Sequence, residues 1–289
     1  MQPVEASRNN DANANFNFML LFSSNSLAFL SSKYDQRLTI RGLRTAANGF
    51  TWLSVLGCVP MRVSDDLLLQ EEFIDATVVA QALAAINSFR EKFPLPLISR
   101  PSGRRPLCYS VIDGHQISDH LPEIQNLHKQ ATAYVRNMFG ESLEPLADKQ
   151  VACNINITQP GGSYRYHYDR NAVTAILYLN ETSGGETECY PSHRLNLMYL
   201  QREVDRVFEN PMCRRVFGRQ ILVRPRTGRL LVMRGDRCLH SVREVHGDAD
   251  RINVVMSYDV KGARYANGDR LNSYLYSSAL HRSDPNYVE

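Results

Sequence analysis

The sequence has no long apolar run and no strong excess of charge of either sign. No stretch reaches the ~18 apolar residues of a membrane-spanning helix, and the apolar segment at residues 16–22 is short and interrupted. The chain before that segment has one Arg and two acidic residues, unlike the positively charged start of a secretory signal. We therefore expect a cytoplasmic protein without a membrane partner. The formal net charge of +3 is too small to indicate nucleic-acid binding by itself, so we expect no nucleic-acid partner.

The cysteines also lack the patterns that would indicate a zinc site or a disulfide framework. The chain has six Cys residues, and none of them forms a CxxC pair. In a chain of 289 residues with no signal segment, reduced thiols are the better interpretation. The hydrophobic content of 43% and the charged content of 22% are typical of a globular protein with one large domain.

The most informative feature is a set of two histidines and one aspartate, His167, Asp169 and His240, followed by Arg251. Residues two apart on a strand point to the same face, so one metal ion can bind both His167 and Asp169. Two imidazoles and one carboxylate leave coordination positions open, which suits a non-haem Fe(II) oxygenase, although zinc accepts the same ligands. The guanidinium of Arg251 can grip a carboxylate through two parallel hydrogen bonds. The combination predicts a site for iron and a 2-oxo acid.

The segments around these residues strengthen that interpretation. They are residues 163–169, 174–180, 184–187, 228–234 and 240–245. With them, the stretch from about residue 151 to 259 resembles the 2-oxoglutarate and Fe(II)-dependent oxygenases, especially the branch related to prolyl hydroxylases. The resemblance implies a double-stranded β-helix, Fe(II), 2-oxoglutarate and O2 as cofactor and co-substrates, and stimulation by ascorbate. It also implies hydrogen abstraction from a substrate C–H bond, which leads to hydroxylation, desaturation or ring closure.

The resemblance suggests roles for further residues in binding 2-oxoglutarate. Tyr178 matches a tyrosine that binds the distal carboxylate of 2-oxoglutarate in prolyl hydroxylases, where Arg251 is the expected anchor. Asn156 and Thr158 lie eleven and nine residues before His167, where nucleic-acid demethylases of the superfamily have an Asn and a Tyr. Because Thr158 is not a tyrosine, that contact would be shorter or lost.

Strand periodicity suggests which residues contact the substrate. Asn253 and Val255 share the face of Arg251, whereas residues 252, 254 and 256 point to the opposite face. Arg165 shares the parity of His167 and Asp169, so we expect Arg165 and Asn253 to contact a small anionic or zwitterionic substrate. By the same argument, we expect three tyrosines to point away from the cavity, Tyr164, Tyr166 and Tyr168. The alternation of polar and apolar residues over 154–158 indicates that this strand lines a wet cavity.

The expected organisation has a flexible tail, a support region and a catalytic core. Residues 1–15 are the tail, and residues 16–150 form an N-terminal helical support region with helices near 73–89, capped by Asp75 or Thr77, and near 121–139. Residues 151–260 form the core, with strands near 151–158, 164–169, 172–180, 186–190, 220–224, 229–234, 240–245 and 251–259. The fold class is therefore mainly β with flanking helices (α+β), and the core is a jelly roll. An insertion at about 192–218 is either a lid or a solvated decoration, and residues 261–289 are a C-terminal extension.

The substrate class stays open between several alternatives. A small molecule, either a free amino acid or a natural-product intermediate, is preferred. Hydroxylation of prolyl or other protein side chains comes second, and nucleic-acid repair comes third because no basic and aromatic platform is present. A nonenzymatic cupin-like binding module would not need Arg251. A zinc hydrolase would be expected to carry a motif such as HExxH, which the sequence lacks.

Overall fold

The computed structural model describes residues 60–100, 105–191, 210, 212 and 219–263. All of them belong to one compact unit, residues 54–289. The predicted tail, nearly all of the 192–218 insertion and nearly all of the C-terminal extension lie outside the described residues. None of the described helices is long and apolar enough to cross a membrane.

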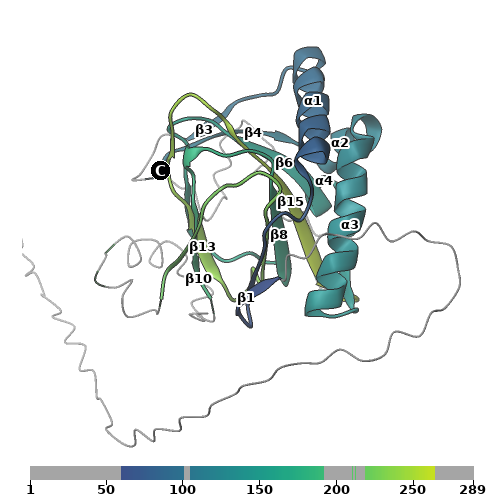
Figure 1. Ribbon diagram of the computed structural model, residues 1–289, viewed down its shortest axis with the longest axis vertical. Coiled ribbons are helices and arrows are strands. Elements are labelled where there is room, and N and C mark those ends of the chain that lie inside the picture. The colour runs from purple at the N-terminus through teal and green to yellow at the C-terminus, as the bar shows by residue number, and fades with distance from the viewer. Residues whose placement is uncertain (1–59, 101–104, 192–209, 211, 213–218, 264–289) are drawn as a thin grey trace, which may run out of the picture. The chain divides into compact units, whose positions relative to one another are not determined.

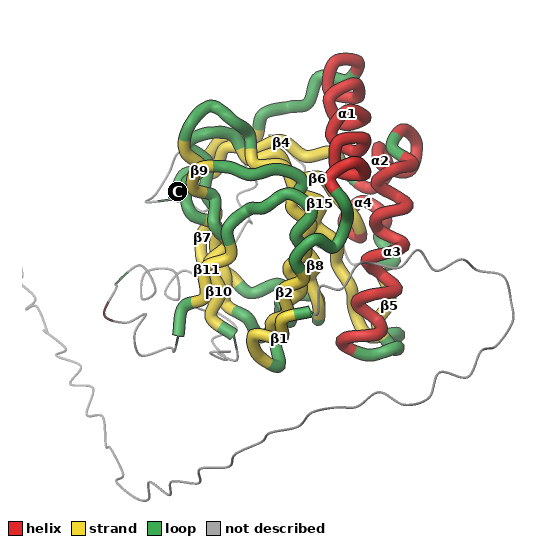
Figure 2. The backbone as a smooth tube through the Cα atoms, in the orientation of Figure 1, coloured by secondary structure: helices red, strands yellow, loops and turns green. Residues whose placement is uncertain are grey.

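Two antiparallel sheets make up the body of this unit (Figures 1 and 2). The larger sheet has nine strands in the order β1-β2-β12-β8-β15-β6-β4-β3, with β5 paired to β15. Its strands are β1 (Met61–Ser64), β2 (Leu67–Gln70), β3 (Ile98–Arg100), β4 (Leu107–Ile112), β5 (Leu143–Pro145), β6 (Cys153–Thr158), β8 (Val173–Tyr178), β12 (Leu230–Met233) and β15 (Arg251–Val260). The smaller sheet has the order β11-β10-β13-β7, formed by β11 (Ile221–Val223), β10 (Thr187–Tyr190), β13 (Leu239–Val242) and β7 (Tyr164–His167). A two-stranded ribbon pairs β14 (Val245–His246) with β9 (Ser183–Gly184).

The eight strands predicted from the sequence are all present, as β6, β7, β8, β10, β11, β12, β13 and β15. They form the two facing sheets of a double-stranded β-helix, so the predicted fold class is confirmed. The region 16–150, expected to be a helical support region, also contributes strands, because β1 to β5 all come from residues 61–145 and join the larger sheet. These strands have three to six residues each, and β2, for example, pairs with the distant strand β12.

Four helices accompany the sheets. Helix α1 (Ala76–Lys92) begins after Asp75, whose carboxylate accepts hydrogen bonds from the backbone N–H groups of Thr77 and Val78 at 2.8 and 3.0 Å. Asp75 is therefore the N-cap, and the helix begins three residues later than predicted. Helix α3 (Pro122–Phe139) agrees with the predicted span and has proline at its first position.

The two short helices were not predicted. Helix α2 (Gly114–His120) begins with a capping box between Asp113 and Gln116, and helix α4 (Lys149–Ala152) is a single turn before β6. Helix α2 has seven residues and α4 has four, so neither is long enough to show a helical period in the sequence.

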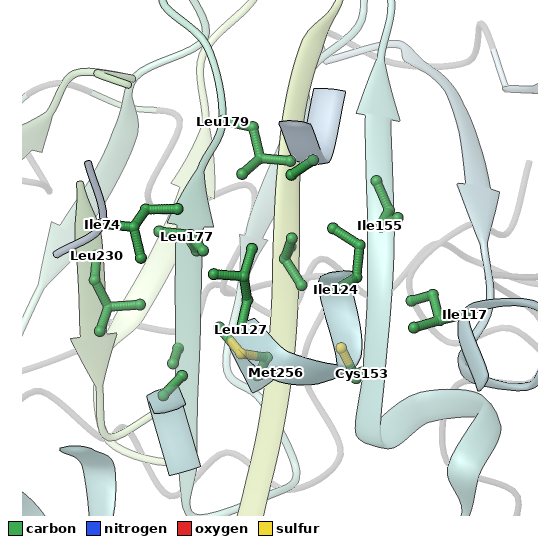
Figure 3. Packing of buried hydrophobic residues seen from close by; sticks show 14 of the residues in the cluster. Ile74, Ile117, Ile124, Leu127, Cys153, Ile155, Leu177, Leu179, Leu230 and Met256 are labelled. Carbon is green, nitrogen blue, oxygen red and sulfur yellow. The ribbon is translucent and has the colours of Figure 1, made fainter. Parts of the chain in front are cut away.

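The helices cover the outer face of the larger sheet (Figure 1). Figure 3 shows Ile124 and Leu127 of α3 beside Cys153, Ile155 and Met256 of the sheet. These side chains are buried and belong to one apolar cluster. Because side chains alternate along a strand, this burial leaves the opposite face of β6, β8 and β15 directed toward the smaller sheet. The packing on one face thereby defines which residues line the space between the sheets.

Candidate metal centre

His167, Asp169 and His240 come together between the two sheets. One ligand atom of each lies within 4.8 Å of those of the other two. The Nε2 atoms of His167 and His240 lie 3.7 and 3.6 Å from the same oxygen of Asp169, Oδ1. His167 and His240 are directly paired across β7 and β13, so the sheet register brings together two residues that are far apart in the sequence. The predicted ligand set is therefore assembled in space.

The hydrogen bonds of the two histidines select the nitrogen atom that is available to a metal. Nδ1 of His167 lies 2.8 Å from the carbonyl oxygen of Arg165, and Nδ1 of His240 lies 3.0 Å from that of Cys238. Each Nδ1–H donates to its carbonyl, which leaves the lone pair of Nε2 directed at the centre. Burial and the neighbouring His240 lower the pKa of His167 to about 4, although Asp169 and the Arg165 carbonyl oppose this shift. His167 is therefore neutral near pH 7, as a metal ligand must be.

Two residues that the sequence analysis did not single out hold the Asp169 carboxylate. The hydroxyl of Thr174 donates to Asp169 Oδ2 at 2.6 Å, and the Asn171 amide donates to that same hydroxyl oxygen at 3.0 Å. Gly235 packs against the carboxylate so closely that a Cβ atom there would lie 2.4 Å from Oδ2. The Asp169 backbone N–H also donates to the Gly235 carbonyl at 2.9 Å. These contacts leave Oδ1 facing the histidines.

Arg251 is a buried cation at one end of the same space. It is 2% exposed, and its Nη1 donates to Asn253 Oδ1 at 2.5 Å while its Nη2 donates to Thr187 Oγ1 at 3.2 Å. Among the described residues, no hydrogen-bond partner reaches its Nε. Burial lowers the pKa of this guanidinium, an effect that the neighbouring phenols of Tyr178 and Tyr164 oppose. A desolvated guanidinium with neutral partners, and with a nitrogen that has no partner among the described residues, is suited to bind an anion.

A glycine makes room for this arginine. Gly185 lies in the turn before β10, and a Cβ atom at this position would lie 2.8 Å from Cδ of Arg251. Its φ is 69°, in the left-handed region that favours glycine. Any larger residue would push the Arg251 side chain out of its place.

A cavity of about 130 Å³ connects Arg251 with the three candidate ligands. At roughly 10–15 Å³ for each water molecule, this volume would hold on the order of ten waters. That is enough for a small dicarboxylate. Asn154 and Asn156 of β6 line it, as the alternation of that strand predicted. Residues 251, 253 and 255 also line it, whereas residues 252, 254 and 256 belong to the apolar cluster under the helices. The predicted parity of β15 is therefore confirmed.

The other residues expected to bind the 2-oxo acid lie close to Arg251. Tyr178 is fully buried, its hydroxyl lies 2.6 Å from Thr187 Oγ1, and the Arg251 guanidinium carbon lies 5.2 Å from its ring centre. The Thr158 hydroxyl donates to Asn156 Oδ1 at 2.9 Å, so this hydroxyl contacts a neighbouring side chain rather than the cavity. The direct contacts of Tyr178, Asn156 and Thr158 with 2-oxoglutarate stay predictions.

The orientation predicted for Tyr164 was wrong. Tyr164 lines the cavity and accepts a 2.6 Å hydrogen bond from the Asn156 amide, whereas Arg165 is not among the described lining residues. The pairing of β7 with β13 shifts register between His240 and Val242, so the alternation counted from His167 does not extend to Tyr164. The contact between Arg165 and the substrate therefore stays a prediction, and Arg165 is not part of the described cavity wall. Asn253 does line the cavity, but its oxygen is occupied by Arg251.

A buried carboxylate, Glu188, binds the strands of the smaller sheet together on the face away from the metal centre. It is 1% exposed and accepts hydrogen bonds from Arg105, Tyr166, Gln220, Ser241 and Arg243 at 2.7 to 2.9 Å. Burial would raise its pKa, but the hydrogen bonds and charge of these partners outweigh burial and lower the pKa to about 2. Tyr166 and Ser241 directly adjoin His167 and His240 in sequence. Glu188 therefore holds β7 and β13, the two strands that carry the histidines, on the face of the smaller sheet away from the metal centre.

The site fits an iron ion together with a carboxylate-bearing co-substrate. Two imidazole nitrogens and one carboxylate converge on one point, and the cavity lies next to that point. Such a set of three ligands with open positions is the arrangement of non-haem Fe(II) sites. At the other end of the cavity, the buried cation of Arg251, whose Nε has no hydrogen-bond partner among the described residues, is suited to a carboxylate.

Comparisons with known proteins agree with this geometry. Residues 152–258 match the 2OG-Fe(II) oxygenase superfamily. No curated protein sequence matches the chain. Among solved structures, AviO1 from Streptomyces viridochromogenes Tue57 is similar, with a TM-score of 0.52 and 18% identity over 69% of this chain and 91% of that one.

Two further structures show the same fold. The epimerase SnoN, in complex with Fe3+, alpha ketoglutarate and nogalamycin RO, has a TM-score of 0.52 and 14% identity over 78% of this chain and 89% of that one. A prolyl hydroxylase from Trichoplax adhaerens, in complex with a hypoxia inducible factor peptide fragment, has a TM-score of 0.50 and 14% identity over 68% of this chain and 85% of that one. At these identities the likeness concerns the fold.

Proposed function

We propose that this enzyme uses Fe(II), 2-oxoglutarate and O2 to oxidise a C–H bond of a small molecule, since residues 152–258 match the 2OG-Fe(II) oxygenase superfamily. The observation that carries the proposal is the combination, on the walls of one cavity, of a three-ligand centre and a buried guanidinium whose described partners are neutral oxygens. A metal site alone would suit a hydrolase or a binding module equally well. The buried cation adds a requirement for a second, anionic ligand.

Each residue of the site has a defined task in this proposal. His167 and His240 present Nε2 to the metal, and Asp169 supplies the only anionic ligand, held by Thr174. Arg251 binds the distal carboxylate of 2-oxoglutarate, with Tyr178 and Asn253 keeping the guanidinium in position. When bound, Fe(II) and 2-oxoglutarate together activate O2 to remove a hydrogen atom from the substrate. The buried walls of the cavity limit the access of water, which suppresses side reactions.

A small-molecule substrate is the preferred class. The cavity of about 130 Å³ is lined by side chains of both sheets, and its small volume suits a compact group more than a folded protein surface. SnoN, whose structure holds nogalamycin RO, is a neighbour with a small-molecule ligand. The Trichoplax adhaerens neighbour, which holds a peptide fragment, keeps hydroxylation of a protein side chain as the alternative. The product is a hydroxylated, desaturated or cyclised compound.

The proposal is tested by following succinate formation from 2-oxoglutarate with Fe(II), with Zn(II) and without metal. We expect turnover with Fe(II) alone among these conditions, and we expect Asp169→Ala to abolish it because the anionic ligand is lost. Asp119→Ala, at an exposed position on α2, removes the same charge elsewhere and should leave turnover unchanged. Full activity with Zn(II), or without any 2-oxo acid, would refute the proposal.

A further inference from the structure

The end of the cavity opposite Arg251 has a chemical character of its own. Along β15, Ser257 lies six residues beyond Arg251, or roughly 20 Å at the rise of an extended strand. Ser257 pairs with Thr174 of β8, and Thr174 holds the Asp169 carboxylate. This end therefore adjoins the metal centre and lies far from the anion-binding end. We call it the distal end because it is distant from Arg251, and it is not the end that takes the distal carboxylate of 2-oxoglutarate. It is lined by Leu146, Val151, Asn154, Asn171, Val255 and Ser257.

None of these six side chains carries a charge. Among the described residues that line the cavity as a whole, the side chains with a formal charge or a metal-ligand role are His167, Asp169, His240 and Arg251. All four are already assigned to iron and to 2-oxoglutarate. The arginines Arg105 and Arg243 hydrogen-bond to Glu188 on the other face of the smaller sheet. The described wall of the distal end thus offers no partner for a substrate carboxylate or ammonium group.

Two polar groups at the distal end remain available to a ligand. Asn154 and Ser257 are half-buried, and their side chains form no hydrogen bond with the other described residues. By contrast, the amide of Asn171 is occupied, because it donates to the Val173 carbonyl at 2.7 Å and to the Thr174 hydroxyl at 3.0 Å. The carboxamide of Asn154 and the hydroxyl of Ser257 can each donate and accept hydrogen bonds. Leu146, Val151 and Val255 surround them with apolar surface.

We propose that the distal end binds an uncharged substrate whose hydroxyl or carbonyl groups contact Asn154 and Ser257 and whose apolar carbons pack on Leu146, Val151 and Val255. The proposal rests on the proposed function, because iron and 2-oxoglutarate are taken to occupy the remainder of the cavity. A buried ionised group without a partner is strongly unfavourable. Free amino acids would bring two such groups, so this site disfavours them. The inference replaces the anionic or zwitterionic substrate that the sequence suggested through Arg165.

The test is a panel of three ligand classes: methyl glycosides and cyclic alcohols, L-amino acids, and monocarboxylic acids. The protein is loaded with Mn(II) and 2-oxoglutarate, and the melting temperature is measured with each compound. Succinate formation is measured in parallel with Fe(II). We expect neutral compounds to raise the melting temperature and to accelerate succinate formation, with no such response to the charged classes. A response to amino acids or carboxylic acids alone, or no response to any neutral compound, would overturn the inference.

The same experiment separates this inference from the function on which it rests. If Mn(II) and 2-oxoglutarate do not raise the melting temperature of the protein, the proposed function fails. If they do, and a charged class is the one that responds, only the distal-end assignment fails.

Substitutions at the distal end locate the contact. For a neutral ligand identified by the panel, Ser257→Ala should weaken binding about two- to tenfold, as expected for loss of one neutral hydrogen bond. Asn154→Asp should weaken it at least about tenfold, because the new carboxylate would be partly buried without a partner. Asn126→Asp, at an exposed position on α3, is the matched control and should bind the ligand as the wild type does. Unchanged binding in both distal-end variants, with 2-oxoglutarate affinity intact, would remove Asn154 and Ser257 from the substrate site.

Discussion

We expect the Arg251→Met variant to be more stable than the wild type when 2-oxoglutarate is absent, and less stable than the wild type when 2-oxoglutarate is bound. Methionine is unbranched and of similar length, so it can occupy the same channel without the charge. In the wild type the guanidinium is 2% exposed and its described partners are neutral oxygens. Desolvating a cation without a counter-charge costs several kcal/mol, which the Tyr178 ring offsets by about 1 to 2 kcal/mol. Asn253 lines the cavity, so water can replace its lost hydrogen bond. We therefore expect Arg251→Met to be more stable than the wild type by about 1 kcal/mol without ligand.

Adding Mn(II) and 2-oxoglutarate should change that order. At a ligand concentration of a hundred times its Kd, binding stabilises the wild type by about 2.7 kcal/mol. Each charge-assisted hydrogen bond from Arg251 to the carboxylate contributes roughly 1.5–3 kcal/mol, so losing two of them weakens affinity by more than about a hundredfold. The variant should then gain less than about 1 kcal/mol from the same ligand concentration. Arg251→Lys should also bind 2-oxoglutarate at least about tenfold more weakly, because an ammonium group cannot make the planar two-point contact.

The assay is urea denaturation with and without Mn(II) and 2-oxoglutarate, together with calorimetric measurement of the 2-oxoglutarate Kd. Arg62→Met, at an exposed position on β1, is the control for loss of a positive charge, and it should change neither quantity. The reasoning would be refuted by an Arg251→Met variant that is destabilised by more than about 2 kcal/mol without ligand and keeps the wild-type Kd for 2-oxoglutarate. That result would mean that the guanidinium is a structural cation rather than an anion receptor.

Three further predictions concern the support of the metal centre. Thr174→Val removes the 2.6 Å hydrogen bond to Asp169 and should weaken Mn(II) binding about ten- to a hundredfold in calorimetry; an unchanged Kd would show that the bond does not position the ligand. Gly235→Ala places a methyl group 2.4 Å from Asp169 Oδ2, so it should displace the carboxylate and weaken Mn(II) binding, and a wild-type Kd would contradict this. The pKa of Glu188 is about 2 in the folded protein, below the ordinary value of 4.5, so its stabilisation of about 3 kcal/mol should be present above pH 4.5 and be lost as the pH falls toward 2. Glu188→Gln should therefore unfold at lower urea than the wild type at pH 7 and differ less from it near pH 3; an equal difference at both pH values would contradict the assignment.

The sequence by itself determined the features that depend on local periodicity. Side chains alternate strictly along one strand, so the count from Arg251 correctly separated residues 253 and 255 in the cavity from residues 252, 254 and 256 in the core. The same rule, applied to the polar side chains of 154 and 156, indicated a wet cavity. The eight core strands were recognisable because short segments of strand-forming residues are separated by Gly, Pro and Asn from residue 151 onward. The ligand set was recognisable because two of its members lie two residues apart.

Features that depend on pairing between distant segments were decided only by the tertiary structure. Strands β1 to β5 were not recognised from the sequence, and two of them pair with strands far away in the chain, β2 with β12 and β5 with β15. The orientation of Tyr164 follows from a register shift between β7 and β13, and alternation within one strand cannot reveal a shift that depends on its neighbour. Glu188 reads as an ordinary exposed acid on a strand, yet its partners arrive from segments between residues 105 and 243. The periodicity of a strand is a property of its own backbone, whereas register and the burial of a charge arise from contacts between segments that the chain brings together only on folding.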